Sequence, residues 1–209
     1  MFETLDQVNW KDYRTFFGAP ENLPDLLIQT QSSSRALQDE AWFDLTHAVC
    51  HQGSPINSAL AIIPFLAEIL RSPTSYGKED AASLLAWMAL SLPLTAGPLT
   101  PAEQLPEQQG AELTQEHQRQ LLRQQLHKAI QPLVPLLYPY VRDPDGDGLI
   151  VLALLRFPDY AATTIPVFDE AMRRERDDDM RQLLQLAAIY LAGGEIKEEY
   201  RHFLGIFPD

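Results

Sequence analysis

The stretch from Arg142 to Gly148, RDPDGDG, begins as a calcium-binding loop begins, with carboxylates at alternate positions before a glycine. Such a loop needs a bidentate acid at its twelfth position, which here is Leu154, inside the apolar run Leu149–Leu155. We therefore interpret the stretch as a turn between helices, in which proline and glycine end one helix and the acids cap the next. The three carboxylates in question are Asp143, Asp145 and Asp147.

A second group with metal-ligand chemistry is HAVCHQG, which brings His47, Cys50 and His51 within one or two helical turns. Zinc requires three or four protein ligands, and the remaining histidines are scattered, so we expect neither a metal nor a cofactor here. We expect Cys50 to be a small buried residue. Glycine-rich phosphate loops and paired catalytic acids are absent from the sequence, and we predict a protein without enzymatic activity.

Composition indicates the class of partner. The 209 residues are 45% hydrophobic and 22% charged, which is typical of a globular protein, and 29 acids against 16 bases give a net charge of −13. This charge repels nucleic acid and attracts basic proteins. The chain has one cysteine, an acidic start unlike a secretory signal and no apolar run near 20 residues, so we expect a cytoplasmic protein without a membrane span.

Helical signals recur along the whole chain, and strand signals are scarce. Four segments with a proline, at Pro24, Pro64, Pro135 and Pro166, are each followed by a polar turn and a second helical segment. We expect these prolines to kink the first helix of each pair. The second segments begin near Ala36, Ala81, Leu149 and Met180.

Capping residues in the sequence mark where some of the predicted helices begin and end. Ser54 and Pro55 fit the N-cap and first residue of a helix, while Asp177–Asp179 and the glycines at 193 and 194 fit the two ends of another. We expect the large aromatic residues of the second helices to pack in the core, and the one nearest the amino terminus to cover the end of the stack. These aromatic residues are Trp42, Trp87 and Tyr190, followed by Trp10.

The paired helices resemble HEAT repeats, and FFGAPENLPDLL, AIIPFLAEIL, RFPDY and ERDDDMRQLLQLAAIYLAGG resemble a bacterial group of HEAT-like proteins of undetermined function. The resemblance implies an all-α fold, a right-handed α-solenoid of about four helix pairs. It covers one domain, residues 1–209, apart from a Pro- and Gln-rich stretch, about 92–112, that we interpret as a flexible insertion. The third repeat departs from the pattern, because GDGLIVLALL lacks the usual arginine after its turn.

We predict a non-catalytic protein-binding module, in which acids at the starts of the second helices form an acidic edge for a basic protein partner. The most specific role is an immunity-type inhibitor of a basic toxin such as a nuclease. The alternative is a HEAT-like enzyme, either a bilin lyase subunit or a relative of DNA glycosylases, although a glycosylase needs a basic groove. The residues predicted to bind the partner are Asp39, Asp80, Asp145 and Asp178.

Overall fold

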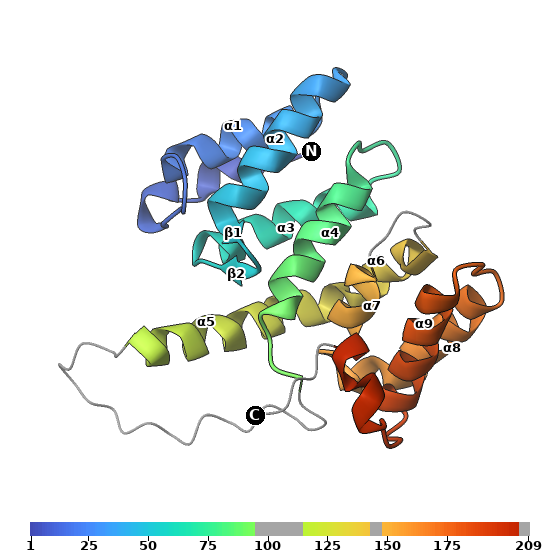
Figure 1. Ribbon diagram of the computed structural model, residues 1–209. Helices are drawn as coiled ribbons and strands as arrows, with labels where there is room; N and C mark the ends of the chain where they lie inside the picture. The colour runs from blue at the N-terminus through green and yellow to red at the C-terminus, as the bar shows by residue number, and fades with distance from the viewer. Residues whose placement is uncertain (95–114, 143–147, 205–209) are drawn as a thin grey trace.

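The computed structural model describes residues 1–94, 115–142 and 148–204, and these ranges are mostly helical (Figure 1). The all-α fold class is therefore confirmed. The α-helices are α1 (Leu23–Gln29), α2 (Arg35–Val49), α3 (Ser58–Arg71), α4 (Lys78–Leu90), α5 (Gln115–Ile130), α6 (Val134–Leu137), α7 (Leu149–Leu154), α8 (Ala161–Met172) and α9 (Asp178–Leu191). Short 3₁₀ helices lie at Leu5–Gln7, Trp10–Asp12, Pro20–Asn22, Gln131–Leu133, Tyr138–Arg142, Pro158–Tyr160 and Glu198–Leu204.

Consecutive helices pack as pairs. Helix α1 packs on α2, α3 on α4 and α8 on α9 (Figure 1). Helix α7 contacts both α4 and α9, so second helices of successive pairs touch one another. The buried side chains form one continuous hydrophobic cluster that runs from Phe2 to Leu204. The amino-terminal and carboxy-terminal helices of the described chain therefore share one core.

The repeated prolines do not occupy equivalent positions. Pro64 and Pro166 lie inside α3 and α8, as expected from the sequence. Pro24 and Pro135 instead lie in the first turns of α1 and α6. A proline in the first turn breaks no helical hydrogen bond, because the amides of that turn have no acceptor within the helix. The expectation that all four prolines kink the first helix of their pair was therefore wrong for Pro24 and Pro135.

The third helix pair is the most irregular. Its first half is broken into α5, a 3₁₀ turn, the four-residue helix α6 and a second 3₁₀ segment. Pro132, Pro135 and Pro139 each lie at the start of one of these segments, because the proline ring would clash with the preceding turn if that helix continued. Its second half, α7, has only six residues, and Leu154 within it is fully buried. The position that a calcium loop would give to an acid therefore lies in the core. The aspartates of that motif lie outside the described residues.

A short hairpin replaces the predicted start of the second pair. Cys50–His51 pairs antiparallel with Ser54–Pro55, and α3 begins only at Ser58. The prediction of Ser54 as the N-cap of this helix was therefore wrong. Gln52 and Gly53 both have positive φ, 51° and 71°, which is the backbone geometry of a two-residue hairpin turn. The serine and proline that suit a helix start also suit the edge of this hairpin.

Helix α9 confirms the predicted boundaries. The side chain of Asp177 accepts a hydrogen bond from the backbone N–H of Met180 at 2.8 Å, which satisfies one free amide of the first turn. At the other end Gly193 has a φ of 75°, which suits a glycine just after a helix.

The aromatic residues of the second helices are not equivalent. Trp42 is buried as predicted, but Trp87 is 39% exposed and Tyr190 is only partly buried. The expectation of a common core role was therefore wrong for Trp87. Trp10 is buried against Phe65, with ring centroids 6.1 Å apart.

Two further expectations concern the insertion and the membrane. Most of the insertion predicted at about 92–112 lies outside the described residues, which resume at Gln115. Within the described ranges, none of the helices combines the length and the apolar character that crossing a bilayer requires.

Candidate functional site

Two helices bring acidic residues to the same place. Asp39 lies on the first half of α2, and its carboxylate accepts from Nε of Arg35 at 2.9 Å. Both side chains are largely exposed, so this ion pair contributes little to stability. Arg35 nevertheless offsets the charge of one carboxylate at the start of α2.

Asp80, in the first turn of α4, interacts electrostatically with this pair. Burial raises the pKa of the half-buried Asp80 carboxyl, Asp39 and Glu79 raise that pKa further, and Arg35 lowers it. Asp39 and Asp80 are thus brought together by the packing of two helix pairs. We call Asp39, Glu79 and Asp80 the α2–α4 acidic cluster.

The acidic cluster also reaches the third helix pair. Tyr140 lies in the 3₁₀ segment after α6, and the pKa of its hydroxyl is raised by burial and, to a smaller extent, by the negative charge of Glu79. Three successive parts of the chain therefore meet at the amino-terminal end of α4. The sequence marks neither Glu79 nor Arg35 as part of the site, because the influence of Arg35 on Asp80 and of Glu79 on Tyr140 arises only when the helices pack.

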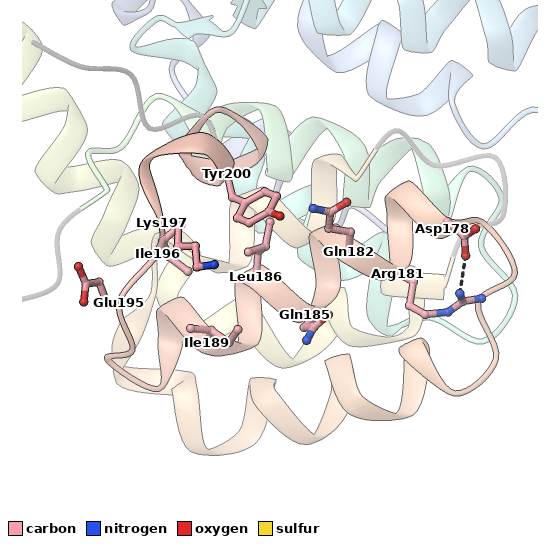
Figure 2. Close-up of a pocket in the computed structure, with 10 residues that line it drawn as sticks. All are labelled: Asp178, Arg181, Gln182, Gln185, Leu186, Ile189, Glu195, Ile196, Lys197 and Tyr200. Carbon is pink, nitrogen blue, oxygen red and sulfur yellow. Dashed lines mark hydrogen bonds and ion pairs between the residues drawn. The ribbon is translucent and has the colours of Figure 1, made fainter.

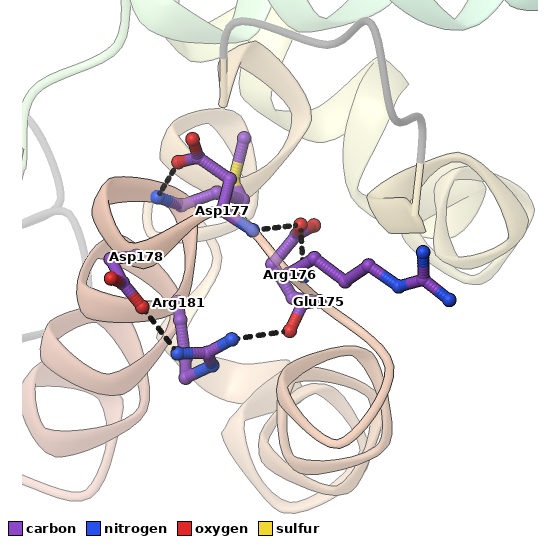
Figure 3. Close-up of polar contacts among 6 residues, drawn as sticks. Glu175, Arg176, Asp177, Asp178 and Arg181 are labelled. Atoms are coloured by element: carbon purple, nitrogen blue, oxygen red, sulfur yellow. Dashed lines mark hydrogen bonds and ion pairs between the residues drawn. The ribbon is translucent and has the colours of Figure 1, made fainter.

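Asp178 lies in a different setting, at the start of α9. Its carboxylate pairs with Nη1 of Arg181 at 2.6 Å, and Arg181 also donates to the backbone oxygen of Glu175 (Figure 3). The charge of Asp178 is therefore partly neutralised within its own turn. No described contact joins Asp178 to the α2–α4 acidic cluster, and Asp145 lies outside the described residues.

A shallow pocket of about 470 Å³ adjoins Asp178 along the outer face of α9 (Figure 2). Leu186, Ile189 and Ile196 supply its apolar surface, and charges of both signs surround them. This mixture provides no concentrated charge for a single ionic ligand. Its polar lining consists of Asp178, Arg181, Gln182, Gln185, Glu195, Lys197 and Tyr200.

Two histidines of the His-Cys-His group, His47 and His51, lie in an aromatic cluster with Phe17 and Phe43. The ring of His47 lies 4.1 Å from that of Phe43 and 5.7 Å from that of His51, while His51 also contacts Phe17 at 5.1 Å. Cys50 is buried, and burial raises the pKa of its thiol to about 11. Over the described part of the chain, the structure has no group of three or more His, Cys, Asp or Glu side chains placed to hold a metal.

This aromatic cluster leaves large apolar side chains in solvent, which the sequence analysis did not predict. Phe43 is 61% exposed and Phe17 is 56% exposed. The backbone N–H of Phe16 donates to the oxygen of Ala48 at 2.8 Å, which holds the amino-terminal segment against the end of α2. The sequence did contain one signal of this exposure. Phe43 lies on the face of α2 that carries the polar residues, whereas Trp42 and Leu45 lie on the buried face.

No protein-family model matches the chain, and neither a curated protein nor a solved structure matches it.

Proposed function

We propose that the chain is a non-catalytic protein-binding module that holds a basic protein against the α2–α4 acidic cluster. The observation that carries this proposal is the convergence of Asp39 and Asp80 from different helix pairs. Burial is the main cause that raises the pKa of Asp80, Arg35 lowers that pKa, and Asp39 adds a smaller increase. A cation placed beside these carboxylates would reduce their mutual repulsion. An arginine or lysine of a partner supplies that cation.

We further propose a HEAT-like α-solenoid as the scaffold. Three pairs of sequence-adjacent helices, and the contacts of α7 with both α4 and α9, support this arrangement. In a solenoid the second helices form an extended surface, on which a partner can touch several repeats at once. The acidic cluster lies where two such helices begin.

The exposed aromatic residues favour a protein as the partner. Phe17 and Phe43 each expose more than half of their surface, and aromatic residues are enriched at the centres of protein interfaces. Phe43 lies one helical turn from Asp39 and Glu40 on α2, so acids flank the aromatic surface. Arginine suits such a surface, because its guanidinium both stacks on aromatic rings and pairs with carboxylates.

The overall charge favours a strongly basic protein as the partner. A net charge of −13 attracts a strongly basic protein over about 8–10 Å at physiological salt. An acidic surface can also occupy a site that is built to bind phosphate. We therefore propose an immunity-type inhibitor of a basic toxin, with a nuclease as the most specific form.

The test combines capture with charge reversal. The wild-type chain and an Asp39→Lys/Asp80→Lys variant, each attached to beads, are exposed to extract from the native host, and bound proteins are identified by mass spectrometry. We expect a basic protein on wild type that is lost from the variant. A Glu21→Lys/Asp25→Lys variant is the matched control, because it makes the same change in net charge at exposed positions of the first helix pair. Equal capture by both variants would contradict the proposal.

A further inference from the structure

The aromatic cluster at the carboxy-terminal end of α2 is continuous and open to solvent. The ring centroid of His47 lies 4.1 Å from that of Phe43 and 6.4 Å from that of Phe17. Phe16, which is 41% exposed, extends the cluster, since its ring centroid lies 5.8 Å from that of His51. The rings come from the amino-terminal segment, from α2 and from the hairpin. The face of an aromatic ring carries partial negative charge, so exposed rings attract a cation.

The hydrogen bond of His47 determines which of its ring nitrogens can accept. Nδ1 lies 2.8 Å from the backbone oxygen of Phe43, and Nδ1 must carry the proton in this contact, because a carbonyl oxygen only accepts. In the neutral ring Nε2 is then an acceptor. Over the described residues Nε2 has no hydrogen-bond partner, and it is not among the polar atoms that are sealed from solvent. The aromatic cluster therefore contains an acceptor that a partner can reach.

Two carboxylates lie beside the cluster on the same face of α2. Glu40 precedes Phe43 by three residues and Asp44 precedes His47 by three residues, and side chains at this spacing are neighbours on a helix. Both acids are exposed, and neither forms an ion pair with any residue that the structure describes. One surface thus combines ring faces, a nitrogen acceptor and free carboxylates, all of which favour a cation with several donors.

We propose that the aromatic cluster, together with Glu40 and Asp44, binds an arginine side chain of the basic partner. The guanidinium stacks on the exposed ring of Phe43 while its N–H groups donate to Nε2 of His47 and to a carboxylate. A lysine ammonium fits less well, because it is strongly hydrated and has no planar face. This inference rests on the proposed function for the source of the arginine, and it makes neutral His47 a residue that determines specificity.

Acidification should weaken this contact. Protonated His47 donates from both ring nitrogens and carries a positive charge, so it no longer accepts from a guanidinium and repels it. The described ring contacts of His47 are with Phe17, Phe43 and His51, and of these only His51 titrates. A proton on His51 repels the guanidinium as well. Asp44, one turn before His47, is the adjacent carboxylate on this face of α2.

Two peptides of equal charge test the preference for arginine on the full-length chain. Acetylated and amidated Lys-Lys-Arg-Lys-Lys and its all-lysine counterpart differ only in the central residue, so their long-range attraction to the acidic protein is the same. Calorimetric titration at pH 8 should show about two- to fivefold tighter binding of the arginine peptide, the effect of one cation–π contact at an exposed site. Equal affinities for the two peptides would overturn the proposal.

Substitutions locate the preference. Phe43→Ala should reduce the ratio of the two affinities to about one. Ile28→Ala is the matched control, because it truncates an apolar side chain on α1 that is 56% exposed, and it should keep the wild-type ratio. A ratio that Phe43→Ala leaves unchanged would overturn the proposed site.

The role of His47 is tested by repeating the titrations at pH 5.5. The wild-type ratio should fall towards one, whereas His47→Gln, whose amide oxygen accepts at both pH values, should have a ratio that does not change with pH. A wild-type ratio that is the same at pH 5.5 as at pH 8 would overturn this role.

The charge-reversed variant Asp39→Lys/Asp80→Lys separates this site from the α2–α4 acidic cluster. It should weaken the binding of both peptides and leave their ratio unchanged, because the ratio depends on the aromatic cluster alone. Unchanged affinities would contradict the proposed function and leave the arginine site standing. A ratio that is lost in this variant would place the arginine at the α2–α4 acidic cluster and would overturn the site at Phe43 and His47.

Discussion

Replacing Gly77 by alanine tests how the first helix pair packs on the second. Gly77 is the N-cap of α4 and has a φ of 63°, a left-handed conformation that alanine adopts at a cost of about 1–2 kcal/mol. A Cβ at this position would lie 2.8 Å from Cε2 and 3.1 Å from Cζ2 of Trp42 on α2. Trp42 is 4% exposed and has little room to move, so the variant combines backbone strain with a steric clash.

A second glycine separates the cost of the clash from the cost of the backbone strain. Gly193 has a φ of 75°, but a Cβ there would have no neighbour within 4 Å. Gly193→Ala should therefore cost only the backbone strain, about 1–2 kcal/mol. Overpacking adds about 1–3 kcal/mol, so Gly77→Ala should cost about 2–5 kcal/mol in total. At this chain length each kcal/mol corresponds to about 2–4 °C in melting temperature.

Urea unfolding followed by far-UV circular dichroism measures the two free energies. A third variant, Trp42→Phe, replaces the indole by a smaller ring, and the cost of Gly77→Ala should be smaller in that background. The reasoning is refuted if Gly77→Ala costs no more than Gly193→Ala. It is also refuted if the extra cost is the same with phenylalanine at position 42.

Three further predictions concern titration and capping. Burial raises the pKa of the Cys50 thiol to about 11, so a disulfide reagent at pH 8 should label it only after unfolding; labelling at the rate of a free thiol would contradict its burial. Because the pKa of Asp80 is raised in the folded protein, its ionised form destabilises the fold at pH 7 and its protonated form does not. The free energy of unfolding of Asp80→Asn, measured in urea at pH 7, should therefore equal or exceed that of wild type, and the difference should shrink as the pH falls through the pKa of Asp80. A difference that grows as the pH falls would contradict this prediction. Asp177→Ala should cost about 1 kcal/mol through loss of the α9 cap, and more than Asp179→Ala in the same urea assay.

The elements that could be predicted from the sequence are those that carry their own boundary signals. Helix α9 has an aspartate that caps its first turn and a glycine just after its last, and both boundaries were found. The hairpin at Cys50–Pro55 was missed, because Ser54 and Pro55 satisfy the local rules for a helix start equally well. The adjacent glycine, Gly53, lies against Trp87 of α4, and that contact between helices is invisible in the local sequence.

The candidate site, too, could be predicted from the sequence only in part. That acids would lie at the starts of second helices followed from the helix boundaries. The sequence did not indicate which of them would meet, because Asp39 and Asp80 are joined only by the packing of α2 near α4. Asp178 was grouped with them by its position in the repeat, yet its charge is paired locally with Arg181.

The most direct test of the acidic cluster as a partner site is the salt dependence of the association rate with the captured basic protein. Stopped-flow measurements from low to physiological ionic strength should show a rate for wild type and Glu21→Lys/Asp25→Lys that falls steeply as salt screens the attraction. Asp39→Lys/Asp80→Lys should give a slower rate that depends much less on salt. The same steep dependence in all three proteins would contradict a partner site at Asp39 and Asp80.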